Sequence, residues 1–130
     1  MSSRAKCTLA YWHHPRFTSG PSGGGVMADV WRTLSEFNVD VIVNGHDHFY
    51  ERFAPQDVNA RRDSAGVIRQ FTVGSGGAVL YPFHSIHPNS EVRIATYGVI
   101  KLILRPGGYD WNFIEAGSGA ILDVGSESCR

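Results

Sequence analysis

Neither sign of charge predominates in this chain. Twelve Lys and Arg side chains balance twelve Asp and Glu, which gives a formal net charge of +0 at pH 7. Since no run of like charge stands out, the sequence lacks the electrostatic footprint of a nucleic-acid-binding protein, and we expect no nucleic-acid partner. No stretch approaches the roughly twenty apolar residues needed to span a bilayer, so we expect no membrane partner either.

Cysteine is also scarce. The two cysteines, Cys7 and Cys129, lie near opposite ends of the sequence. They either form a disulfide or are unrelated thiols, and the sequence leaves both readings open. A disulfide would favour an extracellular or periplasmic location. The 130 residues, 42% of them apolar, are enough for one core, so residues 1–130 are predicted to be a single domain or half of a larger one.

The first part of the chain predicts a strand, a helix and a second strand. Residues 7–12 are β-branched and aromatic, and Pro15 sets the end of that strand. Residues 18–25 predict a flexible polar loop. Apolar residues then recur at helical spacing up to a stop near Asn38: Met27, Val30, Trp31, Leu34 and Phe37. Residues 40–43 predict the next strand, which lies parallel to the first in a βαβ unit.

The second part predicts mainly β structure. Residues 51–66 are polar and predict a surface excursion, residues 67–73 predict a strand, and residues 81–93 are irregular. Residues 97–104 and 109–114 alternate as the two arms of a hairpin. The tail from Gly117 is small and polar, and we expect it on the surface. The predicted fold class is therefore α/β, a βαβ unit plus an antiparallel hairpin.

Three histidines are expected to meet at one edge of the sheet. His13 ends the first strand, and His46 and His48 follow the second, so parallel strands bring the imidazoles together. Clustered imidazoles repel one another when protonated, and a bound cation removes that cost. We therefore predict a metal site of these three residues, with zinc, iron or manganese as the ion. His84 and His87 are expected to be surface or loop-packing residues.

Several neighbouring residues are expected to shape this site. Gly45 supplies the conformational freedom for the turn before His46. Asp47 is expected to point away from both flanking histidines and to support the loop. Glu51 and Arg52 are expected to brace the same loop as an ion pair, and the glycine-rich turn 74–77 brings backbone close to a ligand or a neighbouring loop.

Residues 44–52, Asn-Gly-His-Asp-His-Phe-Tyr-Glu-Arg, resemble the Gly-His-x-His signature of the calcineurin-like metallophosphoesterases. The trailing Tyr-Glu-Arg is similar to that of purple acid phosphatases. The residues around His13 and Pro15 resemble the preceding motif of that superfamily. The resemblance implies that His13 and His46 share one metal of a two-metal site and that His48 binds the other. His14 would contact the substrate as a phosphate-binding or acid group, or support the ligands from behind.

The same resemblance covers only part of the family pattern. The superfamily's Asp-x-His, Gly-Asp-x-x-(Asp or Tyr) and Gly-Asn-His-(Asp or Glu) motifs are absent. The chain thus resembles the carboxyl-terminal half of the family's two-sheet sandwich. The expected function is metal-dependent hydrolysis of a small phosphate ester by metal-activated water. The alternatives are an inactive metal-binding fragment and an oligomerising structural module.

The resemblance also carries an expectation about assembly. If the second sheet of the sandwich is missing, apolar side chains such as Val99, Ile103, Trp111 and Phe113 lose their cover. Self-association would cover them again, so we expect a homo-oligomer.

Overall fold

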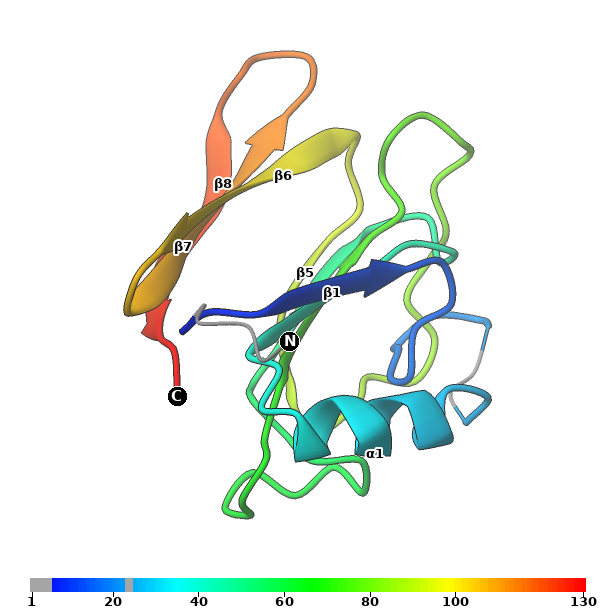
Figure 1. Ribbon diagram of the computed structural model, residues 1–130. Coiled ribbons are helices and arrows are strands. Elements are labelled where there is room, and N and C mark those ends of the chain that lie inside the picture. The colour runs from blue at the N-terminus through cyan, green and yellow to red at the C-terminus, as the bar shows by residue number, and fades with distance from the viewer. Residues whose placement is uncertain (1–5, 23–24) are drawn as a thin grey trace.

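A five-stranded sheet forms the middle layer of the molecule in the computed structural model, which describes residues 6–22 and 25–130 (Figure 1). Its order is β1-β2-β4-β3-β5, from β1 (Leu9–Trp12), β2 (Val41–Asn44), β4 (Arg69–Val73), β3 (Tyr50–Phe53) and β5 (Ser90–Ile94). Strands β1, β2 and β4 are parallel, and β3 is antiparallel to both β4 and β5. The predicted parallel pairing of the first two strands is confirmed.

The single predicted helix is confirmed as α1 (Ala28–Glu36). It lies against the face of the five-stranded sheet opposite the second sheet (Figure 1). The fully buried Trp31 anchors it in a cluster with Phe17 and Ile42. Asn38 follows the helix with a φ of 54°, the left-handed conformation that was expected of it at the helix end.

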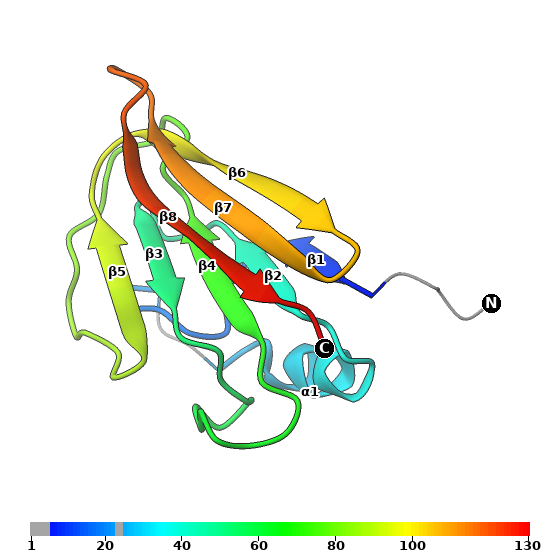
Figure 2. The ribbon, with the colours of Figure 1, turned by 90° about the vertical axis from the view of Figure 1, so that its left-hand side faces the viewer.

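A second sheet covers the other face, and one of its strands was not predicted. The predicted hairpin is confirmed as β6 (Gly98–Arg105) and β7 (Gly108–Glu115). The tail is largely exposed, as expected, but it also forms the strand β8 (Ile121–Ser128), which pairs with β7. The resulting sheet, β6-β7-β8, lies across the five-stranded sheet (Figure 2). The chain therefore contains both sheets of its own sandwich.

The two sheets enclose the aromatic face of β7. Tyr109, Trp111 and Phe113 are 0–4% exposed and pack with residues of the five-stranded sheet such as Val41 and Phe71. Of the side chains expected to lose their cover, Trp111 and Phe113 are thus buried by the chain itself. Val99 and Ile103 remain 57% and 42% exposed. The homo-oligomer stays a prediction, and the exposed apolar surface that it would cover is smaller than expected.

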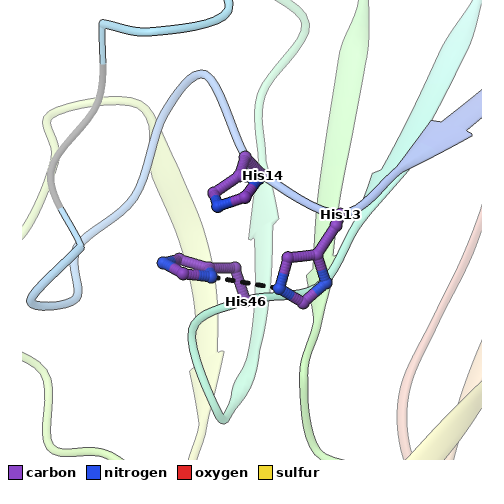
Figure 3. Close-up of side chains that lie close together, drawn as sticks. All are labelled: His13, His14 and His46. Carbon is purple, nitrogen blue, oxygen red and sulfur yellow. Dashed lines mark hydrogen bonds between the residues drawn. The ribbon is translucent and has the colours of Figure 1, made fainter.

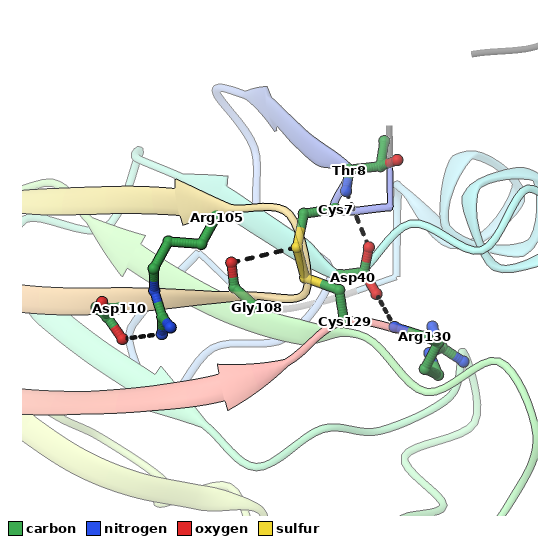
Figure 4. Close-up of a disulfide and its surroundings, with 8 residues drawn as sticks. All are labelled: Cys7, Thr8, Asp40, Arg105, Gly108, Asp110, Cys129 and Arg130. Carbon is green, nitrogen blue, oxygen red and sulfur yellow. Dashed lines mark hydrogen bonds and ion pairs between the residues drawn. A yellow bond between two sulfur atoms is a disulfide. The ribbon is translucent and has the colours of Figure 1, made fainter. Parts of the chain in front are cut away.

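A disulfide between Cys7 and Cys129 joins the start of the first sheet to the end of the second (Figure 4). The carboxylate of Asp40 accepts the backbone N–H of Thr8 and that of Arg130, both at 2.9 Å. These hydrogen bonds tie the same two segments together beside the disulfide. The two cysteines are therefore partners, which the sequence had left open.

Two segments read as irregular are strands. The polar excursion was expected to begin at Glu51, but Tyr50–Phe53 is a buried strand of the larger sheet. Ser90–Ile94 forms the edge strand β5 within the stretch predicted to be irregular. No helix among the described residues has the length and apolar character needed to cross a membrane.

Candidate metal centre

The ends of β1 and β2 bring the histidine segments together. The backbone N–H of Gly45 donates to the carbonyl of His13 at 3.0 Å, and the Asn44 side chain donates to the carbonyl of Trp12 at 3.0 Å. These bonds extend the strand pairing by one step beyond the sheet. As a result, His13 lies directly beside the turn that carries His46.

In the turn after β2, the residue with the strained backbone conformation is a histidine. His46 has a φ of 69°, a left-handed conformation that costs about 1–2 kcal/mol for a residue with a Cβ. The sequence predicts this freedom for Gly45, but Gly45 is not among the glycines of positive φ, so this prediction is wrong. A Cβ on Gly45 would lie 3.6 Å from Nδ1 of His13, an ordinary contact. The turn therefore depends on how His46 is held by its surroundings.

Three imidazoles form a close group at this edge (Figure 3). Nε2 of His13 lies 3.1 Å from Nδ1 of His46, and the ring of His14 lies 4.3 Å from that of His46 between centroids. The ligand atoms of all three lie within 4.8 Å of one another, and no other group of three such side chains does so among the described residues. The structure thus gathers His13, His14 and His46, whereas the sequence predicted His48 as the third member.

His48 lies in the same hollow but outside that group. Its Nδ1–H donates to the carbonyl of Val79 at 2.8 Å, and its ring stacks on Tyr81 with centroids 4.0 Å apart. His13, His46 and His48 all line an open hollow of about 310 Å³, together with Val73, Gly74, Gly76, Gly77 and Ala78. The hydrogen bond fixes the tautomer of His48: Nδ1 carries the proton, and the lone pair of Nε2 is left to bind a metal.

The glycine-rich turn approaches a neighbouring loop, which was one of the two expected reasons for its glycines. A Cβ on Gly74 would lie 1.9 Å from the carbonyl oxygen of Asp47, so only glycine fits there. By contrast, a Cβ on Gly76 or Gly77 would meet nothing within 4 Å. Gly74 is therefore needed for packing against the histidine turn, and the two later glycines leave the hollow open.

The buried carboxylate of Glu51 has partners that the sequence did not reveal. Glu51 is fully buried and accepts from the N–H of Ser19 at 3.0 Å, from the hydroxyl of Ser19 and from that of Ser90. The expected ion pair of Glu51 with Arg52 is not formed; Arg52 contacts Asp123 instead. Burial raises the pKa of Glu51, and the hydrogen bonds from Ser19 and Ser90 only partly offset it.

We expect Glu51→Gln to preserve the fold and Glu51→Ala to weaken it by about 1–3 kcal/mol, because alanine leaves the buried N–H of Ser19 without an acceptor. The raised pKa means that Glu51 favours the folded state while protonated, and that this contribution is lost as pH rises through its folded pKa. Urea unfolding at several pH values checks this. Glu51→Gln should gain stability relative to the wild type as pH rises above 4.5, and a constant difference would contradict the assignment.

The two remaining histidines lie away from the hollow, as expected. His84 is exposed, and His87 is half-buried against the rings of Phe17 and Phe53. Nδ1 of His87 accepts the N–H of Asn89 at 3.1 Å. Burial, and then the nearby Arg16, lower the pKa of His87. These interactions are those of a packing residue.

Comparison with solved structures identifies the type of fold. The purple acid phosphatase PPD1 from yellow lupin (Lupinus luteus) seeds superposes with a TM-score of 0.78 at 21% identity over 94% of this chain. A Plasmodium protein described as GAP50, the anchor in the inner membrane complex, superposes with a TM-score of 0.79 at 19% identity over 97% of this chain. The chain spans 25% and 38% of those two proteins. The chain therefore shares the fold of the superposed part of each of these two proteins.

Sequence comparison adds no relative to these structural matches. No family model matches the chain, and no curated protein matches it. At the identities of the two superposed structures, the likeness establishes the fold alone.

Proposed function

We propose that this chain is the carboxyl-terminal half of a metal-dependent phosphoester hydrolase in which His13, His46 and His48 bind the metal. The observation that carries the proposal is the separation of 3.1 Å between Nε2 of His13 and Nδ1 of His46. Two nitrogens that bind one tetrahedral zinc at about 2.0–2.1 Å lie about 3.3 Å apart. In the structure this contact is a hydrogen bond between the rings, so the rings must turn for both lone pairs to meet one ion, but the spacing of the two nitrogens already suits such an ion.

The hydrogen bond of His48 supports its place in the ligand set. Imidazoles that bind metals usually donate their other ring N–H to a carboxylate or a backbone carbonyl, which fixes the ring. His48 makes such a bond through Nδ1 to Val79, and the stacked ring of Tyr81 holds it from one side. Its Nε2 is thus the atom that would bind a metal, next to the ion held by His13 and His46.

His14 is the side chain that we assign to the substrate. It is exposed, and its ring lies 4.9 Å from that of His13 and 4.3 Å from that of His46 between centroids. Its carbonyl accepts the indole N–H of Trp12 at 2.6 Å, which fixes the backbone from which the ring extends. A protonated His14 would bind an anionic phosphate oxygen or give a proton to the leaving group.

A metal at this site would supply activated water and shield the charge of the phosphate. The described residues contribute only histidines to the central group, and no carboxylate lies within it. A complete two-metal site would therefore need carboxylates from elsewhere, either from a longer polypeptide or from a second copy of the chain. The substrate class is a phosphate ester, and the metal is zinc, iron or manganese.

The second candidate is a metal-binding or structural module without turnover. Two observations favour it: the histidine group lacks a carboxylate, and one of the superposed proteins is described as an anchor. For either candidate, the Cys7–Cys129 disulfide supports an extracellular or periplasmic location, because disulfides persist in oxidising compartments.

The test is the metal content of chain purified without added metal or chelator, measured by mass spectrometry. Hydrolysis of a chromogenic phosphate monoester is assayed on the same sample. We expect His46→Ala to weaken metal binding by more than about 100-fold, because it removes a ligand rather than a supporting group. His84→Ala, an exposed histidine outside the hollow, is the matched control and should keep the metal.

Each outcome selects one proposal. Bound metal and turnover that both depend on His46 would support the hydrolase. Bound metal without turnover would support the metal-binding module. Absence of metal from the wild-type chain would overturn the hydrolase and the metal-binding module and leave only the structural module.

A further inference from the structure

The carboxylate of Asp47 faces away from the hollow and holds a different segment. Asp47 is fully buried, although it lies between two candidate ligands, His46 and His48. Its Oδ2 accepts from the hydroxyl of Thr18 and from that of Ser22, the latter at 2.7 Å. Both donors belong to the polar segment 18–22, which follows the strand end that carries His13 and His14. Asp47 therefore connects the two halves of the histidine group.

The fit between this segment and Asp47 is close. A Cβ on Gly20 would lie 2.6 Å from Oδ2 of Asp47 and 2.7 Å from the ring of Phe49. The N–H of Gly20 donates to the hydroxyl of Thr18 at 2.9 Å, so that hydroxyl both accepts and donates. Only glycine allows the backbone this approach to the carboxylate. The sequence predicted a flexible loop over residues 18–25; residues 18–22 are instead packed in place, and residues 23–24 lie outside the described part.

Other contacts fix the same segment on its far side. Ser19 is 1% exposed, and its N–H and hydroxyl both donate to Glu51. The carbonyl of Ser19 accepts the N–H of His84 at 2.8 Å. Gln70 binds the backbone of Phe17 in both directions, at 3.2 and 2.6 Å. Segment 18–22 is thus held by hydrogen bonds to several other parts of the chain, and Asp47 is the residue by which the histidine turn is joined to it.

The histidine turn needs such a support. His46 holds a left-handed conformation, which persists in a residue with a Cβ only where the surroundings impose it. Gly74 packs against the backbone of Asp47, because its Cα approaches the carbonyl of Asp47 too closely for any side chain. The carboxylate of Asp47 is held separately, by the hydroxyls of Thr18 and Ser22. The turn is therefore held through both the backbone and the side chain of the residue next to His46.

We propose that Asp47 is a positioning residue: its carboxylate fastens the turn carrying His46 to the segment following His13 and His14, and so keeps the imidazoles at coordinating distance. The inference rests on the proposed function for its consequence in metal binding. One consequence does not depend on a metal: Asp47 keeps the rings of His13 and His46 in contact even in the metal-free protein.

The experiment compares Asp47→Ala with Asp47→Asn. Both hydroxyls use Oδ2, so asparagine keeps an acceptor at that position, and alanine keeps none. Cobalt(II) is the probe, with its dissociation constant and its visible absorption spectrum as readouts. We expect Asp47→Ala to weaken cobalt binding by roughly 10–100-fold and to alter the spectrum, as loss of groups that orient ligands usually does. Asp47→Asn should restore most of the affinity.

Asp123→Asn is the matched control for a general loss of stability. It alters another buried carboxylate, one that contacts Arg52 and Tyr50 rather than the histidine turn. We expect this variant to lower the melting temperature and to leave cobalt affinity unchanged. Equal losses of affinity in Asp47→Ala and Asp123→Asn would overturn the inference, as would wild-type affinity in a folded Asp47→Ala.

A metal-free readout separates this inference from the proposed function. Nuclear Overhauser contacts between the rings of His13 and His46 should be present in the wild type and in Asp47→Asn, and absent in Asp47→Ala. If the wild type binds no cobalt, the proposed function is wrong and these contacts decide the inference. Ring contacts that persist in Asp47→Ala would overturn it.

Discussion

Replacement of both Cys7 and Cys129 by serine is expected to lower the free energy of unfolding by about 5 kcal/mol, the chain-entropy value for a closed loop of slightly more than one hundred residues. The disulfide spans a sequence separation of 122 and links the two sheets covalently in addition to the backbone that runs from β5 to β6. Its loss would let the unfolded chain expand and would free β8 from the start of β1. Urea unfolding of the double variant and the wild type checks the value.

Reduction of the wild type provides the control for this prediction. Dithiothreitol should lower the stability of the wild type to that of the double variant and leave the variant unchanged. If the double variant unfolds at the same urea concentration as the oxidised wild type, the disulfide does not constrain the unfolded state as expected.

Asp123→Ala is expected to cost about 3 kcal/mol, because it leaves the guanidinium of Arg52, whose side chain is only 15% exposed, without its main partner. Oδ2 of Asp123 accepts from the hydroxyl of Tyr50 at 2.7 Å, from Nε of Arg52 at 2.8 Å and from the indole N–H of Trp111 at 3.2 Å. These donors come from both sheets, so the carboxylate joins the layers within the core. Because Arg52 keeps its contact with Glu91, we take the lower end of the range of stability losses measured for broken buried ion pairs.

The neighbouring Asp110 gives the matched control. It pairs with Arg105 on the exposed side of the same sheet, where the two side chains are 38% and 51% accessible. An exposed ion pair of this kind contributes about 0–1 kcal/mol, so Asp110→Ala should change the stability little. Equal effects of the two substitutions, measured by urea unfolding, would contradict the role of Asp123 as a link between the sheets.

The pH dependence of the same group follows from its pKa. Burial raises the pKa of Asp123, but the hydrogen bonds from Arg52 and Tyr50 outweigh burial and hold the pKa below 3.8. The ionised carboxylate therefore stabilises the fold above its unfolded pKa, and this contribution is lost as pH falls through the folded value. The stability difference between the wild type and Asp123→Asn should shrink below pH 3.8.

Local pattern was sufficient for the first half of the fold. The apolar spacing around Trp31, the proline after β1 and the β-branched run of β2 each reflect interactions between residues close in sequence. The parallel pairing of β1 with β2 then follows from a short helical crossover. That is why the meeting of His13 with His46 could be predicted before any distance was known.

The second half shows where local pattern is insufficient. Strand β8 is buried on one face by Trp111, whose ring leaves room only for Gly125, and a small polar sequence gives no sign of that contact. Strand β3 carries the buried charges Glu51 and Arg52, whose partners Ser19 and Asp123 lie 32 and 71 residues away. From the sequence alone, charged residues are predicted to lie on the surface, because their distant partners are not known.

Short-range periodicity was enough to predict that imidazoles meet at the carboxyl edge of a parallel strand pair, because it locates the strands and their ends. Which imidazoles come within coordinating distance depends instead on the tertiary structure. His14 joins His13 and His46 because the strained turn at His46 is held between Gly74 and segment 18–22, and His48 is drawn towards Val79 and Tyr81. Those distances depend on packing between segments far apart in the chain, which no local pattern contains.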